Sequence, residues 1–269
     1  MKFGISLGSF PRLVQSDFEK LCEQAQYAGY EGIEYMVAEE DLEVGAEFEQ
    51  KYKKLKEIAD SYNLETPTVF TGLFWTYNPV LPETKEKALK VIEAELKAAS
   101  ILGSRVILVV PAVAVSELDY EEHYRRTIDF LRTAGSMARD YDVIVGVENV
   151  WNRVFAGPLE FRKLLDEVNH EYVKAYFDVG NTLPHSLPEH WIGMLGDYIV
   201  AVHVKGFSVV NLRFGVPLMG SINWKAVNKA FKEIGYDWYV IAEVPPYEGD
   251  PFKAIYDAKT SLDVIFKEK

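Results

Sequence analysis

The chain has 269 residues, 48% of them hydrophobic and 26% charged, which is typical of a folded globular protein and excludes a disordered or fibrous one. Its net charge of -12 would repel a phosphate backbone, and no run of Lys and Arg offsets it, so we expect no nucleic-acid partner. The one cysteine, Cys22, excludes an intrachain disulfide and a thiolate metal cluster.

Short apolar runs alternate with longer amphipathic runs along the whole chain. In chain order, strands are expected at residues 2–7, 32–37, 65–70, 105–110, 143–147, 173–177, 199–204 and 238–242. Helices are expected between them at residues 17–28, 47–62, 84–102, 120–139 and 224–234, with a last helix at 252–266. The proline-rich segments 184–188 and 245–246 are expected to be loops.

Eight such units in succession predict an α/β fold, a single (β/α)8 TIM barrel occupying residues 1–269. The main alternative is an open doubly wound sheet. That fold usually carries a GxGxxG turn after its first strand, and the segment from Gly4 to Gly8 lacks this spacing. The chain begins with no signal-peptide pattern and holds no run of 18 apolar residues, so we expect a cytoplasmic protein with no membrane partner.

Four consecutive strands end in ionisable residues. The apolar runs of strands five to eight lead into Glu148, Asp178, His203 and Glu243, respectively. The carboxyl ends of barrel strands meet at one opening, so these side chains should lie together. Three carboxylates buried side by side require a cation. With one imidazole they form a set suited to Mn²⁺ or Mg²⁺, and Co²⁺ and Zn²⁺ are also compatible.

Several segments resemble the xylose isomerase-like barrels, which include sugar isomerases, ketose 3-epimerases, inosose dehydratase and endonuclease IV. They are GYEGIEY (29–35), VGVENVWN (145–152), AYFDVGNT (175–182), AVHVKGF (201–207) and IAEVPP (241–246). The resemblance implies that the four strand-end residues bind one divalent ion and that Glu148 and Glu243 also act as acid and base. The implied chemistry is proton abstraction alpha to a carbonyl through a metal-stabilised enediolate.

One position departs from the family pattern. Many members carry a histidine three residues after the strand-six aspartate, whereas this chain has Asn181. An asparagine side chain binds a hydroxyl but exchanges no proton near neutral pH. The DVGN form is similar to that of some pentulose-5-phosphate 3-epimerases and favours an epimerase.

Further candidates for substrate binding follow from their positions. Lys205 lies two residues after His203, Arg213 lies in the loop beyond it, Glu34 is expected to end strand two, and Trp151 follows strand five. For Arg213 a solvated loop cation is the alternative, and for Glu34 a structural salt bridge or the orientation of another residue. For Trp151 it is ordinary packing.

The sequence therefore predicts a metal-dependent isomerase or epimerase of a small sugar or sugar phosphate. A dehydratase acting on a keto-inositol needs the same metal and the same proton abstraction, and stays open. A non-catalytic sugar-binding protein that retains the metal site stays open as well. An abasic-site endonuclease is disfavoured because such metal clusters need more histidines than the five present here. Whether the chain forms a homo-oligomer is also left open.

Overall fold

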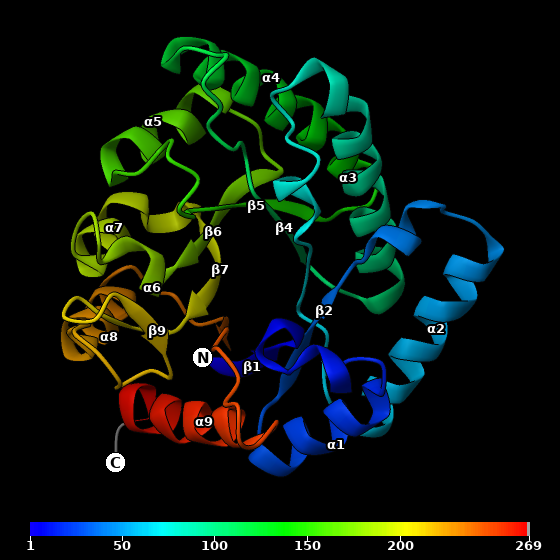
Figure 1. Cartoon of the computed structure of the whole chain (residues 1–269), viewed down its shortest axis with the longest axis vertical. Helices are drawn as coiled ribbons and strands as arrows, with labels where there is room; N and C mark the ends of the chain where they lie inside the picture. Colours follow the sequence, from blue (N-terminus) through cyan, green and yellow to red (C-terminus); the bar gives the residue numbers. More distant parts are fainter. Residues whose placement is uncertain (268–269) are drawn as a thin grey trace.

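The computed structural model describes residues 1–267 of the chain. Eight parallel strands close into a barrel in the order β1-β10-β7-β6-β5-β4-β3-β2, and the helices form a ring outside it (Figure 1). The predicted (β/α)8 barrel is confirmed. Two further strands, β8 and β9, pair with each other as an antiparallel hairpin outside the barrel sheet.

The elements that were predicted from the sequence lie within a few residues of their expected positions. The barrel strands are β1 (Lys2–Ser6), β2 (Gly32–Met36), β3 (Thr68–Phe70), β4 (Val106–Val109), β5 (Ile144–Glu148), β6 (Val173–Asp178), β7 (Ile199–Val204) and β10 (Tyr239–Ala242). The hairpin consists of β8 (Gly206–Ser208) and β9 (Arg213–Gly215). The α-helices are α1 (Phe18–Ala28), α2 (Ala46–Ser61), α3 (Pro82–Leu102), α4 (Tyr120–Arg139), α5 (Pro158–Val168), α6 (Val179–Thr182), α7 (Pro188–Leu195), α8 (Trp224–Glu233) and α9 (Lys253–Phe266). Short 3-10 turns are η1 (Leu7–Ser9), η2 (Arg12–Val14), η3 (Glu39–Leu42), η4 (Leu73–Trp75) and η5 (Gly196–Tyr198).

Local sequence signals explain where several helices begin and end. The Asp119 side chain accepts a hydrogen bond from the Glu122 backbone N–H at 2.8 Å and caps the start of α4. Gly29 ends α1 with a φ of 86°, a left-handed conformation that glycine adopts without a steric penalty. Behind β6, Trp191 of α7 packs on Phe177 with ring centroids 6.3 Å apart. Because Phe177 directly precedes the candidate ligand Asp178, this packing holds β6 in place next to that residue.

Two of the differences from the predicted boundaries have a clear physical reason. The third strand was expected from residue 65 but begins at Thr68, because Pro67 has no N–H to donate to the ladder. Glu65 makes only an isolated bridge to Gly32. The segment 184–188 was expected to be entirely loop, yet Pro188 is the first residue of α7, a position where its missing N–H costs nothing.

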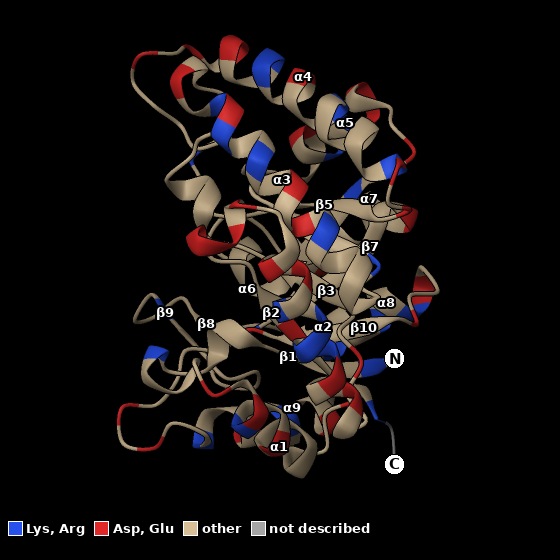
Figure 2. Cartoon of the chain, turned by 90° about the vertical axis from the view of Figure 1, so that its right-hand side faces the viewer, with Lys and Arg blue, Asp and Glu red and all other residues tan. Residues whose placement is uncertain are grey.

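Charged residues of both signs alternate over the outer helices, as α4 shows clearly in Figure 2. Many pair within one helix, for example Arg126 with Glu122 at 2.6 Å. Such surface pairs each add little stability, and their main effect is a polar outer surface. Among residues 1–267, every helix is too short or too polar to cross a membrane.

Candidate functional site

The four predicted ligands meet at the mouth formed by the carboxyl ends of the strands. Glu148 and Asp178 are the last residues of β5 and β6, His203 is the fifth residue of β7, and Glu243 directly follows β10. Each offers one ligand atom, and these atoms lie within 4.8 Å of one another. The strand register brings Asp178 beside His203. The backbone N–H of Glu243 donates to the Val204 carbonyl at 3.0 Å, which extends the neighbouring ladder between β7 and β10.

Two buried polar atoms in this cluster have no hydrogen-bond partner in the described chain, His203 Nδ1 and Asp178 Oδ2. His203 Nδ1 lies 3.5 Å from Glu148 Oε1 and 3.9 Å from Glu243 Oε2. The other oxygen of Asp178, Oδ1, accepts the backbone N–H of Asn181 at 2.8 Å. Buried polar atoms are nearly always satisfied, so these two unpaired atoms fit a site that takes a cation between them. Three carboxylates and one imidazole suit a hard or borderline divalent ion.

Glu34 lies beneath His203, deeper in the barrel than predicted. It does not end β2, which continues for two more residues to Met36. Its carboxylate, fully buried, accepts from Thr68 Oγ1 at 2.9 Å and from the Tyr176 hydroxyl at 2.7 Å. Glu34 Oε2 also lies 2.9 Å from His203 Nε2. A carboxylate bonded to Nε2 turns Nδ1 toward the ligand cluster.

Lys205 reaches into the cluster from the end of β7. Its ammonium lies 2.7 Å from Asp178 Oδ2, a close ion contact without hydrogen-bond geometry, and it donates to Glu243 Oε2. The same ammonium lies 4.9 Å from the ring centre of Phe214. Its stem passes Gly180 so closely that a Cβ there would lie 2.5 Å from Lys205 Cγ. The lysine is therefore part of the cluster.

The two glutamates differ in their electrostatic surroundings. Burial raises the pKa of Glu148 to about 7, although the neighbouring His203 imidazole opposes the rise. Burial acts in the same direction on Glu243, but Lys205 and His203 outweigh it and hold the pKa of Glu243 below its ordinary value. For Lys205, burial favours the neutral amine, yet Asp178 and Glu243 prevail and raise its pKa. Two carboxyl groups with pKa values displaced in opposite directions are a common basis for acid and base roles.

A polar network under the mouth joins β5 to the turn after β6. The Asn149 side chain donates to the Asp178 carbonyl at 2.9 Å and accepts the Asp178 N–H at 2.8 Å. The Asn181 side chain donates to the Asn149 carbonyl at 3.0 Å, and the Trp151 indole N–H donates to the Asn181 carbonyl at 2.9 Å. Asn149 thus fixes the backbone of a predicted ligand. In this structure the Asn181 side-chain N–H serves the network.

An aromatic wall, formed by Trp151, Phe207 and Phe214, stands beside Lys205. The Trp151 ring lies 4.7 Å from Phe214 and 5.5 Å from Phe207, centre to centre. Both phenylalanines belong to the β8–β9 hairpin, which sequence reasoning treated as a loop. Arg213 begins β9 and is exposed.

With this geometry in view, the comparisons with known proteins are informative. Residues 22–267 match the family model described as the xylose isomerase-like TIM barrel. The chain belongs to this family. An inosose dehydratase of Lacticaseibacillus casei is 25% identical over 278 residues, which cover 91% of this chain and 89% of that protein.

Solved structures share the same barrel. A D-psicose 3-epimerase crystallised in the presence of D-fructose superimposes with a TM-score of 0.81 at 17% identity, over 100% of both chains. The IOLI protein, whose structure holds a zinc atom, gives a TM-score of 0.81 at 19% identity, again over 100% of both chains. At these identities the likeness is one of fold.

In this xylose isomerase-like barrel, the structure brings together the four predicted ligands, with Lys205 and Glu34 in direct contact with them. Asn181 and Trp151 lie in the layer just outside, and Arg213 is more distant along the hairpin. Sequence reasoning missed Asn149. The signal was available, because Asn149 directly follows Glu148 at the end of an apolar strand.

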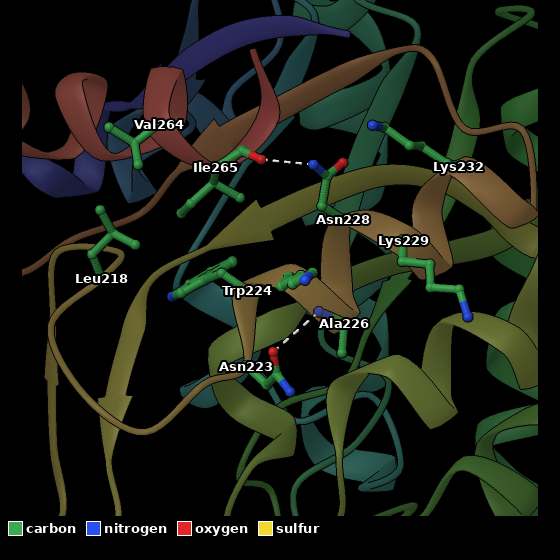
Figure 3. Close-up of a pocket in the computed structure, with 10 residues that line it drawn as sticks. Leu218, Asn223, Trp224, Ala226, Asn228, Lys229, Lys232, Val264 and Ile265 are labelled. Atoms are coloured by element: carbon green, nitrogen blue, oxygen red, sulfur yellow. Dashed lines mark hydrogen bonds between the residues drawn. The ribbon is translucent and has the colours of Figure 1, made fainter. Parts of the chain in front are cut away.

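A separate surface hollow of about 690 Å³ lies in the outer helical layer between α8 and α9 (Figure 3). Trp224 and Ile265 line it, and the Asn228 side chain donates to the Ile265 carbonyl at 2.7 Å across it. The Asn223 side chain caps α8 by accepting the Ala226 N–H. None of the four candidate ligands lines this hollow, and its two asparagines serve the helix cap and the contact between α8 and α9.

Proposed function

We propose that the protein is a divalent-metal-dependent isomerase or epimerase of a small keto sugar, acting by proton abstraction alpha to the carbonyl. One observation carries the proposal. Glu148 and Glu243 stand at the two ends of the arc formed by β5, β6, β7 and β10, with Asp178 and His203 between them. A substrate held at the centre of this arc would have one carboxyl group on each side.

The residues that would hold the ion are Glu148, Asp178, His203 and Glu243. When bound, a divalent ion such as Mn²⁺ or Mg²⁺, or Co²⁺ or Zn²⁺, would polarise the substrate carbonyl and stabilise the negative charge of an enediolate. Glu243, held ionised by Lys205, is suited to remove a proton. Glu148, whose pKa is raised to about 7, is suited to return one from the other face.

The remaining candidates take supporting roles in this proposal. Trp151 covers one side of the site, where its half-exposed ring excludes water and offers a flat surface to a sugar. Arg213 would meet the distal end of the substrate. Glu34 orients His203 and does not reach the substrate, while Asn181 fixes the turn that carries Asp178. Because the ammonium of Lys205 already contacts two carboxylates, we favour an uncharged sugar over a sugar phosphate.

A dehydratase is the second candidate, and the similarity to the Lacticaseibacillus casei inosose dehydratase favours it. The first step would be the same proton abstraction. The two reactions then differ in whether a proton is returned or the neighbouring hydroxyl is lost as water.

The test is turnover by Mn²⁺-loaded protein of a panel of ketoses and keto-inositols in D₂O, followed by NMR. An epimerase should place deuterium on the carbon alpha to the carbonyl of the product, and a dehydratase should release a product lighter by one water. Glu148→Gln and Glu243→Gln should each lower turnover by about 10² to 10⁴. The metal content of each variant must be measured, because each loses a ligand charge. A Glu243→Gln protein that keeps both metal and near-normal turnover would refute the two-carboxylate mechanism.

A further inference from the structure

Lys205 contacts the same carboxylate oxygens that a metal ion would use. Asp178 Oδ1 is occupied by the Asn181 N–H, so Oδ2 is the oxygen left for a metal, and Lys205 lies 2.7 Å from it. Glu243 Oε2, which faces His203 Nδ1, accepts a hydrogen bond from the same ammonium. The lysine and a divalent ion would therefore share two oxygens.

Packing holds the ammonium at these oxygens. The Lys205 side chain is only 11% exposed. Its stem runs against Gly180, where even a methyl group would collide with it, and its ammonium faces the Phe214 ring. Bulk water therefore competes little with the two carboxylates for the lysine ammonium. We therefore expect the charge to stay near the cluster when a metal binds.

A fixed positive charge at this place has two opposite effects. It compensates part of the repulsion among the carboxylates of Glu148, Asp178 and Glu243, which are buried or partly buried within 4.8 Å of one another. It also repels a second cation that approaches the same oxygens, because like charges a few Å apart interact strongly where water is scarce.

We propose that Lys205 is an internal counter-cation that stabilises the fold without metal and weakens metal binding by competing for Asp178 Oδ2 and Glu243 Oε2. The proposal concerns affinity and goes beyond the proposed reaction, so it holds for an isomerase, a dehydratase or a binding protein alike.

The experiment compares wild type with Lys205→Met, which keeps a long apolar stem and removes the charge. Mn²⁺ is titrated into metal-stripped protein by calorimetry, and thermal unfolding is recorded with and without Mn²⁺. We expect Lys205→Met to bind Mn²⁺ at least about 10-fold more tightly. Its metal-free Tm should fall, and its rise in Tm on adding Mn²⁺ should exceed that of wild type.

Lys259→Met is the matched control, since Lys259 is also buried and paired, with Asp263 at 2.7 Å, but lies on α9 away from the ligands. It should lower Tm and leave the Mn²⁺ affinity unchanged. If metal-free Lys205→Met fails to fold, it is purified with Mn²⁺, and the rate of metal loss to a chelator should be slower than for wild type. An affinity of Lys205→Met equal to or weaker than that of wild type, an equal or faster loss of metal, or the absence of binding by either protein would overturn the proposal.

Discussion

Glu34 should control metal affinity from beneath the ligand cluster, and Glu34→Gln tests this. Glu34 Oε1 accepts from Thr68 and Tyr176, so the glutamine oxygen should take that place to keep both bonds. The glutamine NH₂ group then replaces Oε2 and points at His203 Nε2. An NH₂ group can only donate, so His203 must accept at Nε2 and carry its proton on Nδ1. In that tautomer Nδ1 cannot bind a metal.

Loss of such an outer partner typically weakens metal binding about 10- to 100-fold. Because the tautomer is forced, we expect Glu34→Gln to fall near the upper end of this range, which is a loss of about 2.7 kcal/mol in the free energy of metal binding. The assay is calorimetric titration with Mn²⁺, with ¹⁵N NMR of His203 to read the tautomer. Tyr176→Phe is the control, because it removes one donor to Glu34 while the carboxylate still faces His203. A folded Glu34→Gln protein whose Mn²⁺ affinity stays within twofold of wild type would contradict the reasoning.

Two further predictions concern stability. Glu95 on α3 is fully buried, and neither of its carboxylate oxygens has a hydrogen-bond partner among residues 1–267. Burial, with a contribution from Glu34, raises the pKa of Glu95 well above its usual value of 4.5. The folded chain keeps this proton while the unfolded chain loses it, so stability falls as pH rises above that value. Glu95→Gln should therefore be more stable than wild type at pH 8, as measured by urea unfolding. The gain in the free energy of unfolding should shrink toward pH 5, by up to about 1.4 kcal/mol per pH unit. A gain that does not change with pH would count against a buried neutral acid. In the hairpin, a Cβ on Gly206 would lie 2.2 Å from the Met219 carbonyl oxygen, whereas one on Gly215 would meet its first neighbour at 3.5 Å. Gly206→Ala should lower the free energy of unfolding by about 1–3 kcal/mol and change Trp151 fluorescence, whereas Gly215→Ala should do neither. Equal effects of the two substitutions would show that backbone crowding is not the cause.

The sequence was sufficient to predict the barrel and to predict that Glu148, Asp178, His203 and Glu243 would lie together. Apolar runs that end in an acid or a histidine identify strand ends, and the parallel fold brings such ends to one mouth. Depth within the barrel could not be predicted. Whether Glu34 points up at a substrate or across at His203 depends on the stagger between β2 and β7, which no local pattern encodes.

The hairpin and the lysine contact escaped prediction for different reasons. Strands β8 and β9 have three residues each, too few for an alternating pattern to stand out. The position of the Lys205 ammonium depends on the path that Gly180 leaves open, and that glycine lies on a different element. The sequence showed that the residue types were present but not which pairs would meet.

The contact between His203 and Glu34 joins residues 169 positions apart. All four candidate ligands come from the last half of the chain, whereas Glu34 lies on the second strand, and β1 must pair with both β2 and β10 before the ring is complete. A chain whose first strands have not yet docked would already hold the ligands but would leave the imidazole free to rotate. A metal that prefers the oriented imidazole would bind the closed barrel most tightly. By mass action it would then stabilise the pairing of the first strands with the last one.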